Sequence, residues 1–268
     1  MTKNTNTSNS LPDYENPPVQ EVACGIEFKR LQGFKASHIG LFWQKIRDQF
    51  PNCEHAVPLG FPQKPPVSAG DFIFPLPRLW FINNLRNRLV QLQNDRFYYN
   101  WRRMQTEEPY PRYSSVIKEF KNNLQIFEEF LAEEKLGTLD LEGLELTYIN
   151  HIPKGDGWTS VAEIGGVLQD LEWKSKNNRF LPKPKQLKWE TVFHMPEGKG
   201  RLYVKLDTGH RKVDKLQLYI LNISARGQRV DKGKKQMWNW FDLAHEWIVR
   251  GFADLTTEKI QQNIWRRL

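Results

Sequence analysis

Two different hydrophobic repeats occur along this chain, and together they restrict the folds that it can adopt. Apolar and polar residues alternate, as expected for half-buried strands, in five stretches: 21–28, 144–149, 187–195, 201–207 and 216–225. Residues 114–136 and 235–254 instead place apolar side chains three and four positions apart, which is typical of amphipathic helices. The sequence therefore predicts an α+β fold, with two lobes of antiparallel sheet packed against amphipathic helices.

The length of 268 residues exceeds the ~100 to 150 residues most common for one domain, so we expect more than one lobe. The polar start predicts a disordered tail, and the Gly- and Pro-rich stretch after residue 153 predicts a connector. The expected boundaries are a tail at 1–16, an N-terminal α+β lobe at 17–153, a connector at 154–186, and a C-terminal lobe at 187–268 containing a β-meander and a helix.

A hairpin is expected within the N-terminal lobe. Its first strand covers 79–83 and its return strand runs from Leu89 as far as Arg102. A return strand of that length predicts a bulge near Asn94 and Asp95.

The cellular compartment is inferred from features that the sequence lacks. The chain has two cysteines, too few for a disulfide framework, and no signal-peptide pattern at its start. No apolar run approaches the ~20 residues of a membrane-spanning helix. We therefore expect a cytoplasmic protein without a membrane span.

Positive charge is concentrated in the second half of the chain. Between Trp173 and Lys235 there are 17 Lys and Arg against 5 Asp and Glu, although the whole chain has a net charge of only +8. Such a surface favours nucleic acid or another anionic partner, while solvated strand faces would give the same composition. The anion-binding candidates are Arg211 and Lys212 in the turn before the strand at 216–225, and Arg226 and Arg229 after that strand.

Aromatic residues alternate with other residues between Asn94 and Arg103, where arginines are also frequent. Exposed on a strand, Phe97, Tyr99 and Trp101 could stack on nucleic-acid bases. The alternative is that these rings form cross-strand pairs inside the sheet.

Motifs for catalysis and cofactors are largely absent. The chain has no GxSxG elbow, Walker loop or GxGxxG fingerprint. Asp156 followed by Glu172 and Lys174 has the residue types of a metal-dependent nuclease, if the two carboxylates lie on adjacent strand ends. Cys53 and His55 lack a second pair of zinc ligands. We therefore expect no metal and no cofactor.

Several motifs suggest a family. The run LVQLQNDRF at 89–97, NWR at 100–102, YPRY at 110–113 and ELTYIN at 145–150 resemble a sporadically distributed bacterial protein family of unknown function. The resemblance spans about residues 17–265. It implies no activity, cofactor or catalytic residue, but a patchy distribution is typical of accessory genes such as those of phage defence.

These observations together favour a non-enzymatic function. The expected role is a binding or sensing subunit of a bacterial accessory system, with an anionic partner and a protein partner encoded nearby. One alternative is the metal-dependent nuclease. The other is a ligand-pocket or scaffold protein, in which a curved sheet and the helix of residues 240–252 enclose a ligand cavity.

Overall fold

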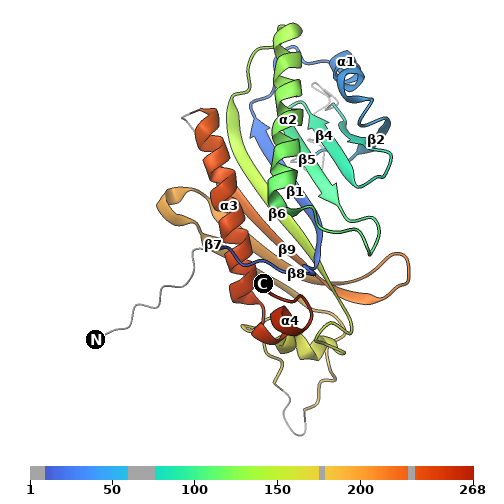
Figure 1. Ribbon diagram of the computed structural model, residues 1–268, viewed down its shortest axis with the longest axis vertical. Coiled ribbons are helices and arrows are strands. Elements are labelled where there is room, and N and C mark those ends of the chain that lie inside the picture. Colours follow the sequence, from blue (N-terminus) through green and yellow to red (C-terminus); the bar gives the residue numbers. More distant parts are fainter. Residues whose placement is uncertain (1–9, 60–75, 175–178, 229–232) are drawn as a thin grey trace. The chain divides into compact units, whose positions relative to one another are not determined.

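The computed structural model describes residues 10–59, 76–174, 179–228 and 233–268 (Figure 1). Its strands form one antiparallel sheet in the order β2-β3-β4-β5-β1-β6-β9-β8-β7. The strands are β1 (Val19–Phe28), β2 (Asn52–Ala56), β3 (Arg78–Ile82), β4 (Arg88–Gln93), β5 (Arg96–Arg102), β6 (Leu141–Pro153), β7 (Lys188–His194), β8 (Arg201–His210) and β9 (Gln217–Gln228).

Four α-helices and two short 3-10 helices accompany these strands in the described part of the chain. They are α1 (Ala36–Ile46), α2 (Arg112–Glu133), α3 (Lys234–Leu255), α4 (Glu258–Asn263), η1 (Val161–Gly166) and η2 (Pro196–Gly198). The combination of an antiparallel sheet with amphipathic helices confirms the predicted α+β fold. Within the described residues, no helix combines the length and apolar character needed to cross a membrane.

The chain divides into two compact units that interleave along the sequence. The first unit contains Met1–Val19, Ile149–Ala225 and Asp242–Leu268, and the second contains Gln20–Tyr148 and Arg226–Phe241. The lobes expected from the sequence were contiguous stretches, so this division differs from them. The difference arises because β6, β9 and α3 each contribute residues to both units.

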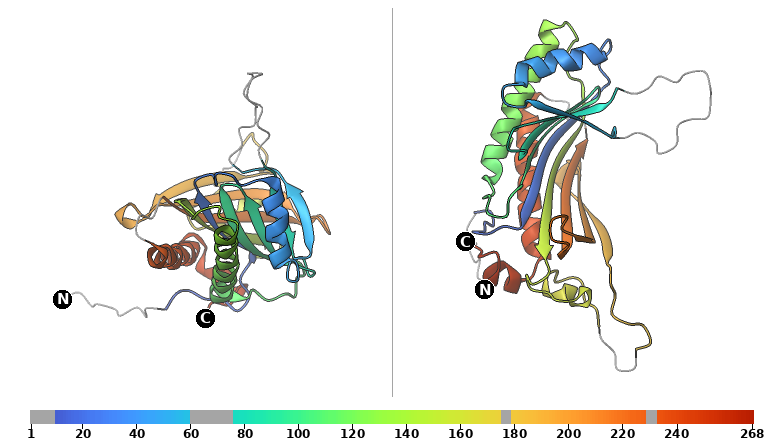
Figure 2. Two further views of the ribbon diagram at one scale, coloured as in Figure 1. Left: turned by 90° about the horizontal axis from the view of Figure 1, so that it is seen from above. Right: turned by 90° about the vertical axis from the view of Figure 1, so that its right-hand side faces the viewer.

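An aromatic core joins α1 and α2 to the sheet of the second unit. Both helices lie on the same face of β3, β4 and β5 (Figure 2). Phe42 of α1 lies with its ring centroid 6.0 Å from Phe81 of β3 and 5.2 Å from Phe127 of α2. Phe97 of β5 stacks on Phe127 at 5.1 Å. The apolar stripe of each helix therefore meets the apolar face of the sheet, as its periodicity predicts.

The predicted hairpin proves to be part of a three-stranded meander. Residues Asn94 and Asp95 form a tight turn between β4 and β5, where Gln93 pairs with Arg96. The expected bulge in one long strand was therefore wrong. Asn and Asp favour tight turns, and the carbonyls of Asn94 and Asp95 are fixed by the backbone N–H groups of Leu31 and Phe28.

Residues 13–16, which fall within the tail expected at 1–16, are hydrogen-bonded to the end of the chain. Residues 1–9 lie outside the described residues, but Tyr14 is buried and packs edge-on against Phe252 and Trp265, at 5.7 and 6.1 Å. The backbone N–H groups of Glu15 and Asn16 donate to carbonyls of residues 266 and 265. A single aromatic anchor produces no periodic pattern, so sequence reasoning missed it.

In the first unit, β7, β8 and β9 follow one another in the sheet, as the sequence predicted. Trp189 pairs with Leu206 and Phe193 with Leu202 across β7 and β8. The buried side chains of β8 are Leu202, Val204 and Leu206. The other face of β7 and β8 carries mainly charged residues, with Val192 and Tyr203 among them.

Candidate ligand-binding cavity

The aromatic residues proposed for base stacking belong to the core. Phe97, Tyr99 and Trp101 are each at most 1% exposed. A ring buried to this degree has no face available for a nucleic-acid base, so the structure corrects that hypothesis. The alternation was real, but it places these side chains on the face of β5 that α2 covers.

Arg211 is engaged within its own turn. Its Nε and Nη2 donate to the two carboxylate oxygens of Asp214, at 2.9 and 2.5 Å. This bidentate contact lowers the pKa of Asp214 to about 2. Lys212 beside it is exposed. The guanidinium that was proposed to bind an anion therefore already holds a carboxylate of the chain.

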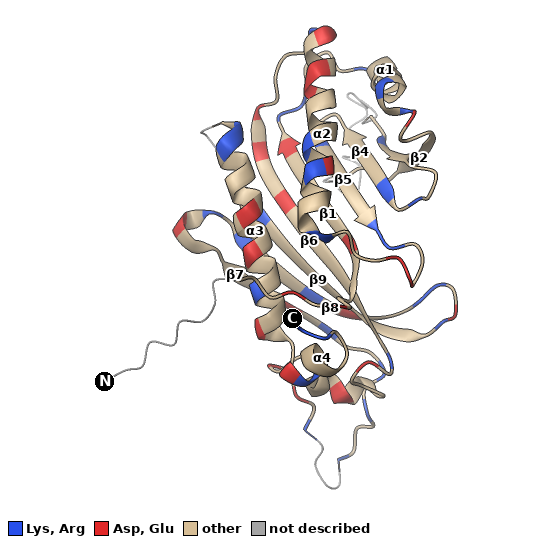
Figure 3. Ribbon diagram, in the orientation of Figure 1, with Lys and Arg blue, Asp and Glu red and all other residues tan. Residues whose placement is uncertain are grey.

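Arg226 belongs to the second unit, where its Nε lies 3.4 Å from a carboxylate oxygen of Glu145. Arg229 lies outside the described residues. In the first unit the basic segment also contains cross-strand ion pairs, such as Lys205 with Glu190 at 2.9 Å. The loop between β8 and β9 likewise carries both signs of charge (Figure 3).

The residues proposed for a nuclease site do not form a ligand set. Asp156 lies in the turn after β6, and burial raises the pKa of its carboxyl. Glu172 and Lys174 are 69% and 77% exposed and lie in a segment without regular secondary structure, so Glu172 is not at a strand end. Among the described residues, no three His, Cys, Asp or Glu side chains gather as metal ligands would.

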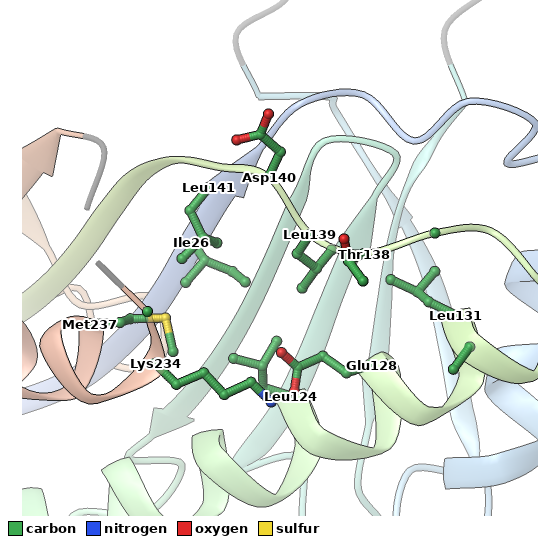
Figure 4. A pocket seen from close by; sticks show the side chains of 13 residues that line it. Ile26, Leu124, Glu128, Leu131, Thr138, Leu139, Asp140, Leu141, Lys234 and Met237 are labelled. Atoms are coloured by element: carbon green, nitrogen blue, oxygen red, sulfur yellow. Dashed lines mark hydrogen bonds and ion pairs between the residues drawn. The ribbon is translucent and has the colours of Figure 1, made fainter. Parts of the chain in front are cut away.

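A cavity of about 450 Å³ lies in the second unit between α2, β1, the segment after α2 and the start of α3 (Figure 4). Its walls are mainly aliphatic. The apolar side chains that line it are Ile26, Leu124, Leu131, Ala132, Leu139, Leu141 and Met237. This volume falls within the ~300 to 1,000 Å³ range typical of small-molecule sites.

Charged side chains accompany this apolar lining. The Nζ of Lys234 lies 2.7 Å from a carboxylate oxygen of Glu128, and both residues line the cavity. Asp140, also in the lining, pairs with Lys29 at 2.5 Å. The carboxylate of Glu128 is the more buried partner, with 27% of its side chain exposed against 67% for Lys234.

Helical spacing and one turn bring the lining together. Leu124, Glu128 and Leu131 follow one another at intervals of four and three residues, so they share one side of α2. Gly137 then adopts a φ of +88°, a left-handed conformation that glycine accepts without strain, and the chain turns toward β6. This turn places Leu139 and Leu141 opposite the helix (Figure 4).

Sequence reasoning did not identify this cavity. Its residues come from four segments between positions 26 and 237, and none of them forms a recognisable motif. The apolar stripe of α2 was a visible signal, but it does not indicate what lies across from it. The chain matches no protein-family model and no curated protein.

Proposed function

We propose that this chain is a non-enzymatic binding protein that senses an amphipathic small molecule in the second-unit cavity. The observation that carries the proposal is an aliphatic cavity of about 450 Å³ with a charged pair in its lining. An apolar pocket with a few convergent polar groups is the usual form of a ligand site. The sensing subunit of an accessory system, with a partner encoded nearby, is consistent with such a site.

The charges favour a ligand with a cationic head. The lining contributes the carboxylates of Glu128 and Asp140 against the ammonium of Lys234. Lys234 is the more exposed member of its pair and lies on a flexible stem, so a ligand ammonium can displace it from Glu128. The apolar body of the ligand would then lie among Leu124, Leu131 and Leu139.

Three ligands with the same alkyl chain test this assignment. Decylamine and decanoate, each below its micelle concentration, and decanol, below its solubility limit, are titrated into the protein by calorimetry. We expect decylamine to bind most tightly, decanol next and decanoate least. Binding of none of them, or tightest binding of decanoate, would contradict the proposal.

Variants then locate the binding. Ala132→Trp fills the cavity from an exposed position of α2 and should abolish binding, whereas Asn122→Trp, exposed on the same helix outside the lining, should not. Glu128→Gln should remove the preference for the amine over the alcohol. Lys234→Gln should strengthen amine binding, because it removes the internal competitor.

An anionic partner is the second candidate, and the excess of basic residues in the first unit favours it. Between residues 173 and 225 the described chain has eleven Lys and Arg against four acids. Each of these acids already pairs with a basic residue of the same segment. The remaining bases, among them exposed Lys212, are the groups that would contact phosphates.

Salt dependence tests this second candidate. A short DNA duplex is titrated at several salt concentrations. The slope of log K against log salt should be about −0.9 for each phosphate contact. Lys212→Ala should reduce the slope by about one, whereas Lys199→Ala, whose side chain is paired with Glu197, should change it less. No binding at low salt would exclude nucleic acid as the partner.

A further inference from the structure

β7 is the last strand in the sheet order, and one of its edges has no strand beside it among the described residues. Its other edge pairs with β8. The N–H of Thr208 donates to the carbonyl of Leu187 and that of Met195 donates to Gly200, at 3.1 and 2.9 Å. Hydrogen-bonded pairs alternate along an antiparallel ladder. The odd-numbered residues of β7 therefore bond to β8.

The even-numbered residues of β7 point their backbone groups the other way. In this alternation the N–H and C=O groups of Lys188, Glu190, Val192 and His194 face the open edge. A row of such groups is a template for another strand, and proteins weaken such templates with prolines, bulges, charged side chains or a covering segment. β7 carries two charged side chains, Lys188 and Glu190. β7 contains no proline.

Two apolar side chains of this edge strand are exposed: Val192 at 42% and Phe193 at 43%. Phe193 also borders a groove of about 390 Å³ between β8 and the first-unit part of α3, lined by Leu202, Trp247 and Leu255. A strand added at the edge would cover both exposed side chains.

The geometry points to a second copy of this chain as the occupant, joined through β7 in a two-fold antiparallel pair centred on Thr191. In that register Lys188 pairs with His194 of the second copy and Glu190 with Val192. All four outward-facing residues then find partners, and none is left over. The register also opposes no two carboxylates.

The same register matches the apolar face. Trp189 lies opposite Phe193 of the second copy in a non-hydrogen-bonded pair, where cross-strand side chains approach most closely. Both rings lie on the face of β7 that carries the groove, since odd-numbered residues share that face. In the dimer, the Phe193 ring of each copy therefore lies beside the Trp189 ring of the other copy.

Sedimentation velocity and light scattering over about 1 to about 200 µM protein test the dimer, because a seven-residue strand forms a small interface of modest affinity. We expect the wild type to convert from monomer to dimer across this range. A wild type that stays monomeric at the highest concentration overturns the proposal. A dimer that forms through another surface also overturns it, and substitutions at Val192 distinguish that dimer from one formed through β7.

Val192→Pro removes an outward N–H and no bond to β8, so the folded monomer should persist while dimerisation weakens at least tenfold. Val192→Thr keeps the N–H and should dimerise like the wild type. Circular dichroism and thermal melting show whether the proline variant is folded. An unchanged dimer in the folded proline variant excludes this edge.

A charge exchange tests the register independently of the proline. Val192→Glu places a carboxylate opposite Glu190 of the second copy and should weaken the dimer. Adding Glu190→Lys restores opposite charges at both symmetric positions and should recover the dimer to within about threefold of the wild type. Failure of this recovery excludes the register centred on Thr191. An edge that instead captures an extended peptide of another protein would leave the wild type monomeric.

Discussion

Gly25 lets a tyrosine ring pack directly on the backbone of β1 in the second unit, because glycine has no side chain. A Cβ at this position of β1 would lie 2.1 Å from Cε1 of Tyr98, the residue of β5 that pairs with Gly25. The phenol ring therefore covers the glycine directly. The Tyr98 hydroxyl donates to Glu145 at 3.3 Å, and this contact helps to fix the ring.

Replacing Gly25 by alanine should therefore destabilise the protein. Because the Tyr98 ring must move, we expect a loss of about 1 to 3 kcal/mol in the free energy of unfolding, measured by denaturant titration. Gly40→Ala is the matched control, because its Cβ in α1 would meet nothing within 4 Å and alanine favours helix. Equal effects of the two substitutions would contradict the steric explanation.

His245 is predicted to give the folding stability a pH dependence. Burial lowers its pKa from 6.5 to about 4, against the opposing effects of Asp242, Asp13 and Glu246. The unfolded state therefore binds more protons between these pH values, and this contribution to stability is lost as pH falls from about 6.5 to about 4. At about 1.4 kcal/mol per pKa unit, a shift from 6.5 to about 4 gives a loss of at most about 3.5 kcal/mol.

Unfolding titrations at several pH values check this prediction. The wild type should lose more stability than His245→Gln between pH ~6.5 and ~4, because glutamine does not titrate. Parallel pH profiles for the two proteins would exclude His245 as the cause. Titrating groups that do not interact with His245 contribute equally to both curves.

At the scale of elements, the short segment before β1 contributes more than its length suggests. Tyr14 is 4% exposed, and its hydroxyl donates to the side-chain oxygen of Gln261 at 3.1 Å. Its ring contacts Phe252 and Trp265. Together with backbone hydrogen bonds to residues 265–268, this side chain attaches residues 13–16 to α3 and to the end of the chain.

Removing that ring should loosen the segment. We expect Tyr14→Ala to cost about 3 kcal/mol of unfolding free energy and to speed proteolysis before β1, because it leaves a cavity beside two aromatic rings. Glu15→Ala removes only an exposed ion pair with Arg266 and should change stability by less than about 0.5 kcal/mol. A small effect of Tyr14→Ala would mean that backbone pairing alone holds the segment.

At the scale of the whole molecule, the interleaved units determine which fragments can fold. The second unit takes Arg226–Phe241 from the C-terminal half, and the first takes Met1–Val19 from the start. A cut at residue 153 therefore divides both units. Contiguous lobes would instead survive that cut.

We expect fragments 1–153 and 154–268 to remain unfolded when produced separately, because each would lack segments that complete its core. Thermal unfolding followed by circular dichroism measures this. Co-production should restore a cooperative transition. A cooperative transition in either fragment alone would show that the predicted boundary is a true domain boundary.

The sequence by itself determined the local elements. The spacing of apolar residues predicted α2 and α3 to within a few residues, and the alternation near 187–225 predicted β7, β8 and β9 as neighbours. It also predicted the fold class. These features depend on which side chains share a face, and a periodic pattern records that directly.

Only the tertiary structure decided which faces are covered. Alternation placed Phe97, Tyr99 and Trp101 together, but α2, packed against β5, made them core rather than an exposed surface. The cavity likewise needs α2, β1, the turn at Gly137 and the start of α3 at one place. The periodicity of a helix or strand is set by residues that are close together in the chain. Whether a second element covers one of its faces depends on contacts between segments that are far apart in the chain. A single sequence contains no direct record of those contacts.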